Sequence, residues 1–408
     1  MPLRPMADRY ERPAWVRRLN LMADATGGAS SVVPIVADEL LESAVAAAGH
    51  DFDDLGDGDW ESRFRLLVAA VGENDLHVVG RMLTREELLR CLITRIHLGR
   101  VHRVEPTMAE APIVAPLAVV GPARSGTTIT FELVGLDATL RTPIAADVIH
   151  VGSPLDDAGR HRAAECEQEL WADVQPEFAA VHELRSDLPV ECVTIAAPSF
   201  AGSHWMMVLQ HLGDWTPDPA ADFALHRAVL QAAQFGGEPT SWLIKTPAYL
   251  LSIDDLVAAY PDVTVLQTHR DPAKTMPSTV STTALVQWLR TDHVDVDALA
   301  EVIGAVFSGA LSAVAASRAD GSFPVPVGDV RFTDLIADPS AAISRAYAEL
   351  GREYRPDHAA AIDRYVRDKP KGKFGHHRYT ADDWGFDADT LRAEMQDYLD
   401  RVGIEIER

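Results

Sequence analysis

Residues 121–128 (GPARSGTT) combine two glycines, a cation and three hydroxyl side chains, which are groups that bind anions. The apolar run 113–120 before them is typical of a buried strand, and a helical pattern follows as far as Leu136. A glycine loop between a strand and a helix presents backbone N–H groups at the positive end of the helix dipole. The loop has the Gly-x-x-x-x-Gly spacing of a P-loop, with Thr128 in its Ser/Thr position. We therefore predict an anion site here.

One position departs from the P-loop of nucleotide kinases and NTPases. Those enzymes carry a lysine for the β- and γ-phosphates where Thr127 stands, and the only cation of this loop is Arg124. A P-loop kinase or NTPase, which would also need an aspartate for Mg²⁺, is therefore the alternative enzyme rather than the favoured one. The expected anion ligands are Arg124, Ser125, Gly126, Thr127 and Thr128.

A second group of anion-binding residue types follows the apolar run 263–267. Arg270 comes directly after this predicted strand, and Ser278 lies eight residues further on, in a predicted helix that begins near Pro272. Open α/β sheets bind ligands at the carboxyl ends of their strands. Two helical turns separate the residues, so both side chains can reach one phosphate, which the arginine fork binds bidentately.

A third group, near the C-terminus, contains Lys371, Gly372 and Gly375, and basic side chains surround it. Two glycines allow the backbone to approach a ligand closely. The neighbouring cations stand out in an otherwise acidic chain; they are Lys369, Lys373 and Arg378. We expect Lys371 and Gly372 to contact an anion.

The three motifs, in this order, resemble those of the sulfotransferases that use 3′-phosphoadenosine 5′-phosphosulfate (PAPS). The resemblance covers about residues 113–390 and is closest to an actinobacterial-type branch, through VRFTDLIADP at 330–339 and HRYTADDWGFD at 377–387. It implies that the first loop binds the 5′-phosphosulfate, with Arg124 in place of the usual lysine. It also implies that Arg270 and Ser278 bind the 3′-phosphate and that the third loop, which has Pro370 in place of an arginine, closes over it.

The same resemblance implies the chemistry. PAPS would donate a sulfuryl group to a hydroxyl of an acceptor and leave as 3′-phosphoadenosine 5′-phosphate (PAP), and no metal ion is expected. Arg124 and Lys245 would stabilise charge that develops at the bridging oxygen. Lys245 is assigned because Lys245-Thr246 resembles the Lys-Thr that precedes the catalytic histidine in the cytosolic branch, although Pro247 stands where that histidine would be.

A general base is still needed to accept the proton of the acceptor hydroxyl. His182 is the first choice, because it opens a polar stretch and an imidazole titrates near neutral pH. Asp147 is the second, at about the position where the heparan-type branch carries a catalytic glutamate. His150 and Glu191 stay possible. A protein that retains PAP binding but has lost its base is the non-catalytic alternative.

The acceptor is not specified by the sequence. Apolar helical segments within 187–235 carry Trp205, Trp215 and Phe223, which could line a pocket for a lipid, a sterol or a phenol, and a carbohydrate is also possible. Ordinary core packing explains these aromatic side chains equally well. A small molecule or a glycolipid with a free hydroxyl is therefore the expected partner.

The elements that position these residues alternate between strands and helices. Apolar runs at 113–120, 242–244, 263–267 and 325–332 predict strands, and helical patterns follow the first three. We therefore expect an α/β fold with a P-loop-like parallel sheet flanked by helices. Residues 1–105 predict a helical N-terminal region packed on the sulfotransferase domain 106–408. Within it, a helical insertion at about 155–236 would form a lid or an acceptor wall. A capping box at Thr84 and Glu87 predicts a helix start.

The composition limits the remaining classes. The chain has 408 residues, 47% of them hydrophobic, and a formal net charge of −24, which repels nucleic acid and anionic lipid. No apolar run approaches the roughly 20 residues of a membrane span, and the first residues lack a signal peptide. The three cysteines are far apart and predict neither disulfides nor a zinc site. We therefore expect a cytoplasmic protein without stable membrane insertion, and the oligomeric state stays open.

Overall fold

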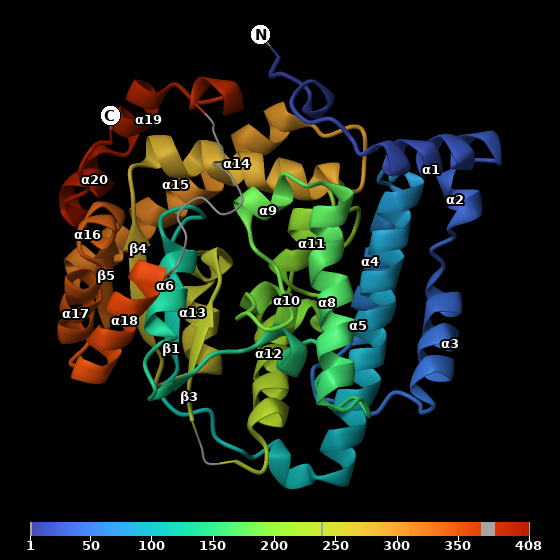
Figure 1. Cartoon of the computed structure of the whole chain (residues 1–408), viewed down its shortest axis with the longest axis horizontal. Helices are drawn as coiled ribbons and strands as arrows, with labels where there is room; N and C mark the ends of the chain where they lie inside the picture. Colours follow the sequence, from blue (N-terminus) through green and yellow to red (C-terminus); the bar gives the residue numbers. More distant parts are fainter. Residues whose placement is uncertain (1, 238–239, 369–379, 408) are drawn as a thin grey trace.

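The fold is built on a five-stranded parallel sheet with the strand order β2-β3-β1-β4-β5. The structure, a computed structural model, describes residues 2–237, 240–368 and 380–407 (Figure 1). The strands are β1 (Leu117–Val120), β2 (Leu140–Arg141), β3 (Ser241–Lys245), β4 (Thr264–His269) and β5 (Val327–Arg331). All pairs are parallel, so the predicted α/β class is confirmed.

The central strand shows why apolar runs predicted the sheet. All four residues of β1 are buried, because helices cover both faces of the sheet. Leu117 and Val119 point to one face and Ala118 and Val120 to the other, each pair in a separate hydrophobic cluster. Four strands lie where the sequence predicted them. The short strand β2 was not predicted, because two residues carry no periodic signal.

Two different sets of helices cover the two faces of the sheet. The face of Leu117 packs against α6 (Thr127–Val134), α16 (Phe332–Ala337), α17 (Pro339–Glu349) and α18 (Pro356–Asp368). The face of Ala118 packs against α12 (Pro219–Gln234), α13 (Ile253–Ala259), α15 (Val296–Asp320), α19 (Ala388–Glu394) and α20 (Gln396–Val402). The long helix α14 (Pro272–Trp288) joins this core to the N-terminal helices.

Asp-Pro pairs start three of these helices. In α12, α14 and α17 the aspartate side chain accepts a hydrogen bond from a backbone N–H of the first turn, and the proline occupies the first helical position. The proline lacks only an N–H that would have no partner inside the helix, and its fixed φ suits a helix start. The pairs are Asp218-Pro219, Asp271-Pro272 and Asp338-Pro339.

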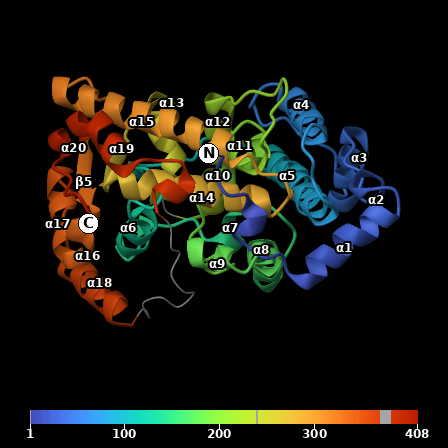
Figure 2. The same ribbon diagram turned by 90° about the horizontal axis from the view of Figure 1, so that it is seen from above.

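The N-terminal region is helical, as expected, and forms the end of the molecule opposite β5 and α16–α18 (Figures 1 and 2). Its elements are η1 (Met6–Asp8), α1 (Ala14–Ala25), α2 (Ala29–Val32), α3 (Ala37–Ala48), α4 (Trp60–Gly72), α5 (Val78–Val104) and η2 (Pro106–Met108). The predicted helix start at Thr84 is wrong, because α5 runs uninterrupted through it and is capped at its start by His77. Thr84 is fully buried, and Glu87 pairs with Arg290 instead of completing a cap.

The segment between β2 and β3 contains mainly helices and lies between the sheet and the N-terminal helices (Figure 2). The elements are α7 (Ala145–Val148), α8 (Asp157–Val174), α9 (Phe178–Val181), α10 (Cys192–Ala196), η3 (Ala197–Ser199) and α11 (Ser203–Val208), followed by α12. The remaining 3-10 helices are η4 (Pro247–Leu251) and η5 (Asp382–Trp384). Trp205, Trp215 and Phe223 are buried in the cores of the fold, so they pack rather than line an open pocket.

The sequence-based statement that no apolar run approaches the length of a membrane span overlooked α15. This helix has 25 residues and a window with a mean hydropathy of 1.8, of which 28% is buried. By length and composition alone, α15 could cross a membrane. One such helix is weak evidence for a membrane span, because helices of soluble proteins pass the same test. The side chains of Ile303, Leu311 and Val314 lie in the hydrophobic clusters of the fold.

Candidate active site

The glycine loop 121–128, which we call the anion loop because the sequence predicts an anion site there, follows β1 and ends in α6, as expected. Gly121 adopts a φ of +134°, and a Cβ there would lie 2.3 Å from the hydroxyl oxygen of Thr268. Gly126, the N-cap of α6, adopts a φ of +98°. Both conformations strain any side-chain-bearing residue. The two glycines therefore allow β1, β4 and α6 to meet closely around the loop.

The backbone N–H groups of the loop divide into two sets. The Ser125 amide donates to the carbonyl of Pro122, and the Ser125 hydroxyl contacts both that carbonyl and the Thr268 hydroxyl. Ser125 thus closes the loop instead of presenting donors to a ligand. The amides of Gly126, Thr127 and Thr128 have no acceptor within the described residues, and they lie at the start of α6. These free donors are suited to an anion.

The side chain of Arg124 lies beside the segment between β2 and β3. Its φ of +66° is unusual for a residue with a side chain. One guanidinium nitrogen, Nη1, lies 3.3 Å from the carbonyl oxygen of Val181, and the buried Nε has no partner among the described residues. The cation therefore lies between the anion loop and the residue that precedes His182, with a donor left free.

Lys245 ends β3, the strand beside β1, and its side chain reaches the first turn of α6. Its ammonium Nζ lies 3.3 Å from the hydroxyl oxygen of Thr128 and forms a close ion pair with Glu191. The Lys245 side chain is 2% exposed, whereas that of Glu191 is 19% exposed. A buried ammonium therefore connects the anion loop to a carboxylate that solvent can reach.

His182 belongs to the same group of residues. Its Nε2 lies 3.2 Å from Oε1 of Glu191, and its side chain is 25% exposed. Burial alone would raise the pKa of the Glu191 carboxyl, but Lys245 and His182 together lower this pKa to about 2. We call Arg124, Thr128, Lys245, Glu191 and His182 the edge cluster, because they meet where β1 and β3 end.

Two other candidates for the base lie outside these contacts. Asp147, on the short helix α7, has no hydrogen bond or ion pair of its side chain within the described residues. His150 is directed elsewhere, since its Nε2 lies 3.1 Å from Glu167, which also pairs with the buried Arg90. Glu191, in contrast, occupies the centre of the edge cluster, although the sequence offered it only as a further possibility.

Arg270 lies at the end of β4, as predicted, but its fork is occupied. Its Nε and Nη2 donate to the two carboxylate oxygens of Glu407 at 2.7 and 2.8 Å, and its Nη1 donates to the carbonyl of Arg124 at 3.0 Å. Ser278 is fully buried in α14, and its hydroxyl has no partner among the described residues. Lys371 and Gly372 lie outside the described residues. Nothing in the sequence pointed to Glu407, because its partner is 137 residues away.

Metal-binding residues are not clustered in the described part of the chain: no group of three or more His, Cys, Asp or Glu side chains there could hold an ion. The anion loop and the edge cluster offer cationic side chains and backbone amides as ligands. Both bind anions such as phosphate and sulfate.

Comparison with known proteins gives a family and a fold. Residues 116–356 match the Sulfotransferase family. The sulfotransferase STF9 from Mycobacterium avium is 22% identical, with a TM-score of 0.78 over 91% of this chain and 98% of that chain. The sulfotransferase STF1 from Mycobacterium tuberculosis H37Rv is also 22% identical, with a TM-score of 0.69 over 88% and 97%. No curated protein matches the chain.

The two structures are less than 25% identical to the chain, so they show a shared fold. The family match covers more than half of the residues and includes the anion loop, Lys245 and Arg270. It agrees with the family that the sequence motifs resemble. The chain belongs to the sulfotransferase family.

Proposed function

We propose that the chain transfers a sulfuryl group from PAPS to a hydroxyl of a small-molecule or glycolipid acceptor. The observation that carries the proposal is the edge cluster. There Lys245 contacts both Thr128 of the anion loop and Glu191, and Glu191 contacts His182. One small region therefore holds donors for an anion and a candidate base for a hydroxyl.

The donor would bind along the carboxyl ends of β1 and β4. The free amides of Gly126, Thr127 and Thr128, with Arg124, would hold the 5′-phosphosulfate. Arg270 and Ser278, aided by the third motif at Lys371 and Gly372, would hold the 3′-phosphate. The buried Ser278 hydroxyl without a partner supports this role, since buried polar groups normally have one.

The residues of the edge cluster would divide the chemistry. His182 accepts the proton of the acceptor hydroxyl while its oxygen forms a bond to sulfur, and the bond between sulfur and the bridging oxygen of PAPS breaks. The negative charge that develops on that oxygen is stabilised by Lys245 and Arg124, and PAP leaves. No step requires a metal ion.

His182 is favoured over Glu191 as the base because of their electrostatic environments. A carboxylate whose pKa is lowered to about 2 is a poor proton acceptor. The same carboxylate can orient an imidazole at 3.2 Å and stabilise the charge that the imidazole gains. We therefore assign Glu191 a positioning role. Asp147 is the alternative base.

The segment between β2 and β3 would form the acceptor side of the site, because it supplies both His182 and Glu191. We propose a cytoplasmic enzyme, with 1–105 as a helical region packed on the domain 106–408. The described cysteines are all free thiols, which fits a reducing compartment. The side chains of α15 that lie in the hydrophobic clusters favour a helix that packs on one side against the fold over a membrane span.

One assay tests the function. The full chain is incubated with PAPS and a panel of hydroxyl acceptors, with EDTA present, and PAP is measured. We expect PAP release that depends on an acceptor and survives EDTA. Release of ADP from ATP with a strict Mg²⁺ requirement would instead indicate a kinase. PAP binding without turnover of any acceptor would indicate a binding protein.

A further inference from the structure

The C-terminal segment after α20 crosses the carboxyl end of β4, where Arg270 lies. Glu407 places both carboxylate oxygens on the Arg270 fork, at 2.7 and 2.8 Å. The guanidinium is also stacked on the ring of Phe332, at 3.8 Å from its centroid. The Nε and Nη2 side of the fork, which can bind an anion bidentately, is therefore already taken by an anion.

The backbone of Glu407 is held as firmly as its side chain. Its N–H donates to Asp271 at 3.1 Å, and its carbonyl accepts from Arg392 at 3.1 Å. Asp271 is fully buried and pairs with the same Arg392 at 2.6 Å. Further back, Arg331 donates to the carbonyl of Val402 at 2.8 Å. Several separate contacts thus direct this one carboxylate onto Arg270.

We propose that Glu407 is an internal competitor of the 3′-phosphate of the donor. The proposal rests on the proposed function, in which Arg270 binds that phosphate. A carboxylate and a phosphate cannot share the Nε and Nη2 side of the guanidinium, because both are anions that need the same two N–H groups. Donor binding then requires Glu407 to leave Arg270, and the apparent affinity falls by the fraction of molecules in which the fork is free.

Two features separate this arrangement from an ordinary structural ion pair. Ser278, the second expected ligand of the 3′-phosphate, is fully buried two turns into the helix after Arg270, and its hydroxyl has no partner among the described residues. Buried hydroxyls usually have a partner, so the Ser278 hydroxyl is available to a phosphate oxygen. The pair is also reachable, since Arg270 is 16% and Glu407 21% exposed.

The proposed competition at Arg270 also involves the anion loop. Arg270 donates through Nη1 to the carbonyl of Arg124, the loop cation. A phosphate that replaces Glu407 therefore binds a guanidinium that already contacts the 5′-phosphosulfate loop. If the phosphate replaces Glu407 at Arg270, the affinity for the donor depends on Glu407, a residue that contacts neither the sulfuryl group nor the acceptor.

The test compares two ligands and two charge-matched variants by isothermal titration calorimetry of the full chain. PAP carries the 3′-phosphate, and adenosine 5′-monophosphate (AMP) lacks it. Glu407→Ala removes the competitor. Glu405→Ala removes an equal charge from an exposed glutamate two residues away, which forms no ion pair or hydrogen bond within the described residues. Glu407→Gln is a milder variant if Glu407→Ala folds poorly.

We expect Glu407→Ala to tighten PAP binding about tenfold, the size of one hydrogen bond to a charged group, and to leave AMP binding unchanged. Glu405→Ala should alter PAP binding less than about twofold. In an Arg270→Ala background, Glu407→Ala should have no further effect on PAP. An unchanged PAP-to-AMP affinity ratio in Glu407→Ala and Glu407→Gln would overturn the proposal.

The outcomes also separate this inference from the proposed function. If Arg270→Ala weakens PAP binding while Glu407→Ala is neutral, the competition is refuted and the PAPS site stands. If the unaltered chain and all variants fail to bind PAP, the proposed donor is wrong, and the competition falls with it.

Discussion

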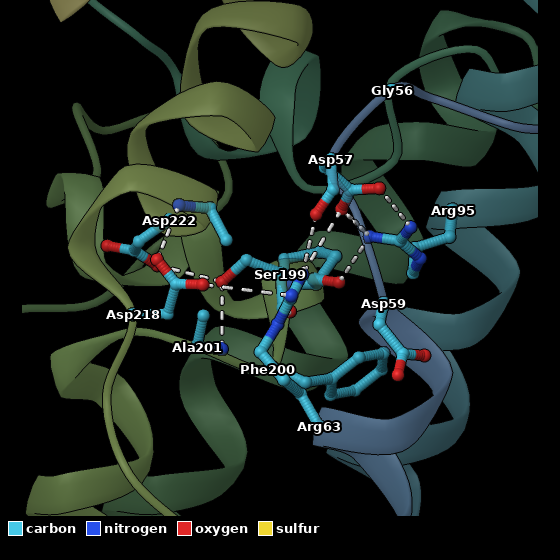
Figure 3. Close-up of polar contacts among 12 residues, drawn as sticks. Gly56, Asp57, Asp59, Arg63, Arg95, Ser199, Phe200, Ala201, Asp218 and Asp222 are labelled. Carbon is cyan, nitrogen blue, oxygen red and sulfur yellow. Dashed lines mark hydrogen bonds and ion pairs between the residues drawn. The ribbon is translucent and has the colours of Figure 1, made fainter.

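Two clusters of charged side chains lie in different parts of the fold, and they differ in their access to solvent. The first joins the N-terminal helices to η3 and α12 and contains Asp57, Arg63, Arg95, Ser199 and Asp222; we call it the sealed cluster (Figure 3). Asp57 and Arg95 are each 2% exposed. In the edge cluster, by contrast, Glu191 and His182 are 19% and 25% exposed.

The contacts of the sealed cluster are typical of a structural joint. Asp57 accepts from both Nη1 and Nη2 of Arg95 at 2.7 and 2.9 Å, and Arg95 also donates to the carbonyl of Pro198 (Figure 3). Arg63 donates to the backbone carbonyls of Asp57 and Ser199. These bonds hold distant segments together, whereas the imidazole of His182 and the carboxylate of Glu191 in the edge cluster are partly exposed to solvent. The comparison predicts that mutations in the sealed cluster change stability and mutations in the edge cluster change turnover.

The largest effect is expected for Asp57→Ala. The variant leaves the Arg95 guanidinium buried without its counter-ion, so the free energy of unfolding should fall by about 3–5 kcal/mol. Chemical denaturation measures this change. Asp51→Ala, at an exposed aspartate nearby, is the control and should stay within about 0.5 kcal/mol of the unaltered chain. Equal effects of the two variants would mean that the sealed cluster does not hold the helices together.

Lys245→Met should have the largest effect on turnover. Loss of a donor that stabilises the leaving oxygen should lower kcat by a factor of about 10²–10³. The free energy of unfolding should change less than in Asp57→Ala, because Glu191 keeps its contact with His182 and is partly solvated. Initial rates at saturating PAPS provide the measurement. A variant with normal kcat and strongly reduced stability would show that the two clusters have the same structural role.

His182→Ala should lower kcat by about 10²-fold, because proton transfer then lacks its acceptor. The affinity for PAP should stay nearly unchanged, since other groups hold the donor. Asp147→Ala is the matched comparison. Loss of turnover in Asp147→Ala alone would move the base to that carboxylate, and full activity of both variants would leave positioning as the source of catalysis.

The smallest effect concerns the pH dependence of the sealed cluster. Burial, with a smaller contribution from Asp218, raises the pKa of Asp222 to about 7. The folded chain thus binds this proton more tightly than the unfolded chain, whose aspartate has the ordinary value of 3.8. The stabilisation is complete below that value and is lost as pH rises through 7.

Asp222→Asn should therefore raise the free energy of unfolding, relative to the unaltered chain, by about 2 kcal/mol more at pH 8 than at pH 5. Melting temperatures at the two pH values measure the difference. Asp214→Asn, at an exposed position, controls for the loss of charge. If Asp222→Asn destabilises the chain equally at both pH values, the carboxyl is ionised in the folded protein and serves mainly as an acceptor.

The sequence predicted most of the sheet because parallel strands that are buried on both faces are short apolar runs. The anion loop was predictable for a related reason: Gly121 and Gly126 adopt conformations that few other residues allow. The helix start at Thr84 was predicted wrongly, since a local capping pattern cannot show that Glu87 pairs with Arg290, which is 203 residues away. A local sequence pattern does not predict a helix start correctly when a side chain of that pattern pairs with a distant residue.

The same limit applies to the candidate site. His182 was chosen for its residue type, but its contact with Glu191 depends on how the segment between β2 and β3 folds back over the sheet. The central place of Glu191 and the position of Glu407 on Arg270 come from tertiary contacts. No spacing in the sequence encodes them.

The central position of β1 has a consequence for folding kinetics. Both neighbours of β1 are made much later, and the loop contact between Ser125 and Thr268 joins residues 143 apart. Such pairing requires closure of a long loop, whose entropic cost precedes any stabilising contact, so the sheet should form slowly. During synthesis, β1 emerges without a strand to pair with until β3 and β4 have left the ribosome. A nascent chain therefore gains its anion loop only after β4, which ends at His269, has emerged, and recovery of ligand binding during refolding would report the pairing of β1 with β4.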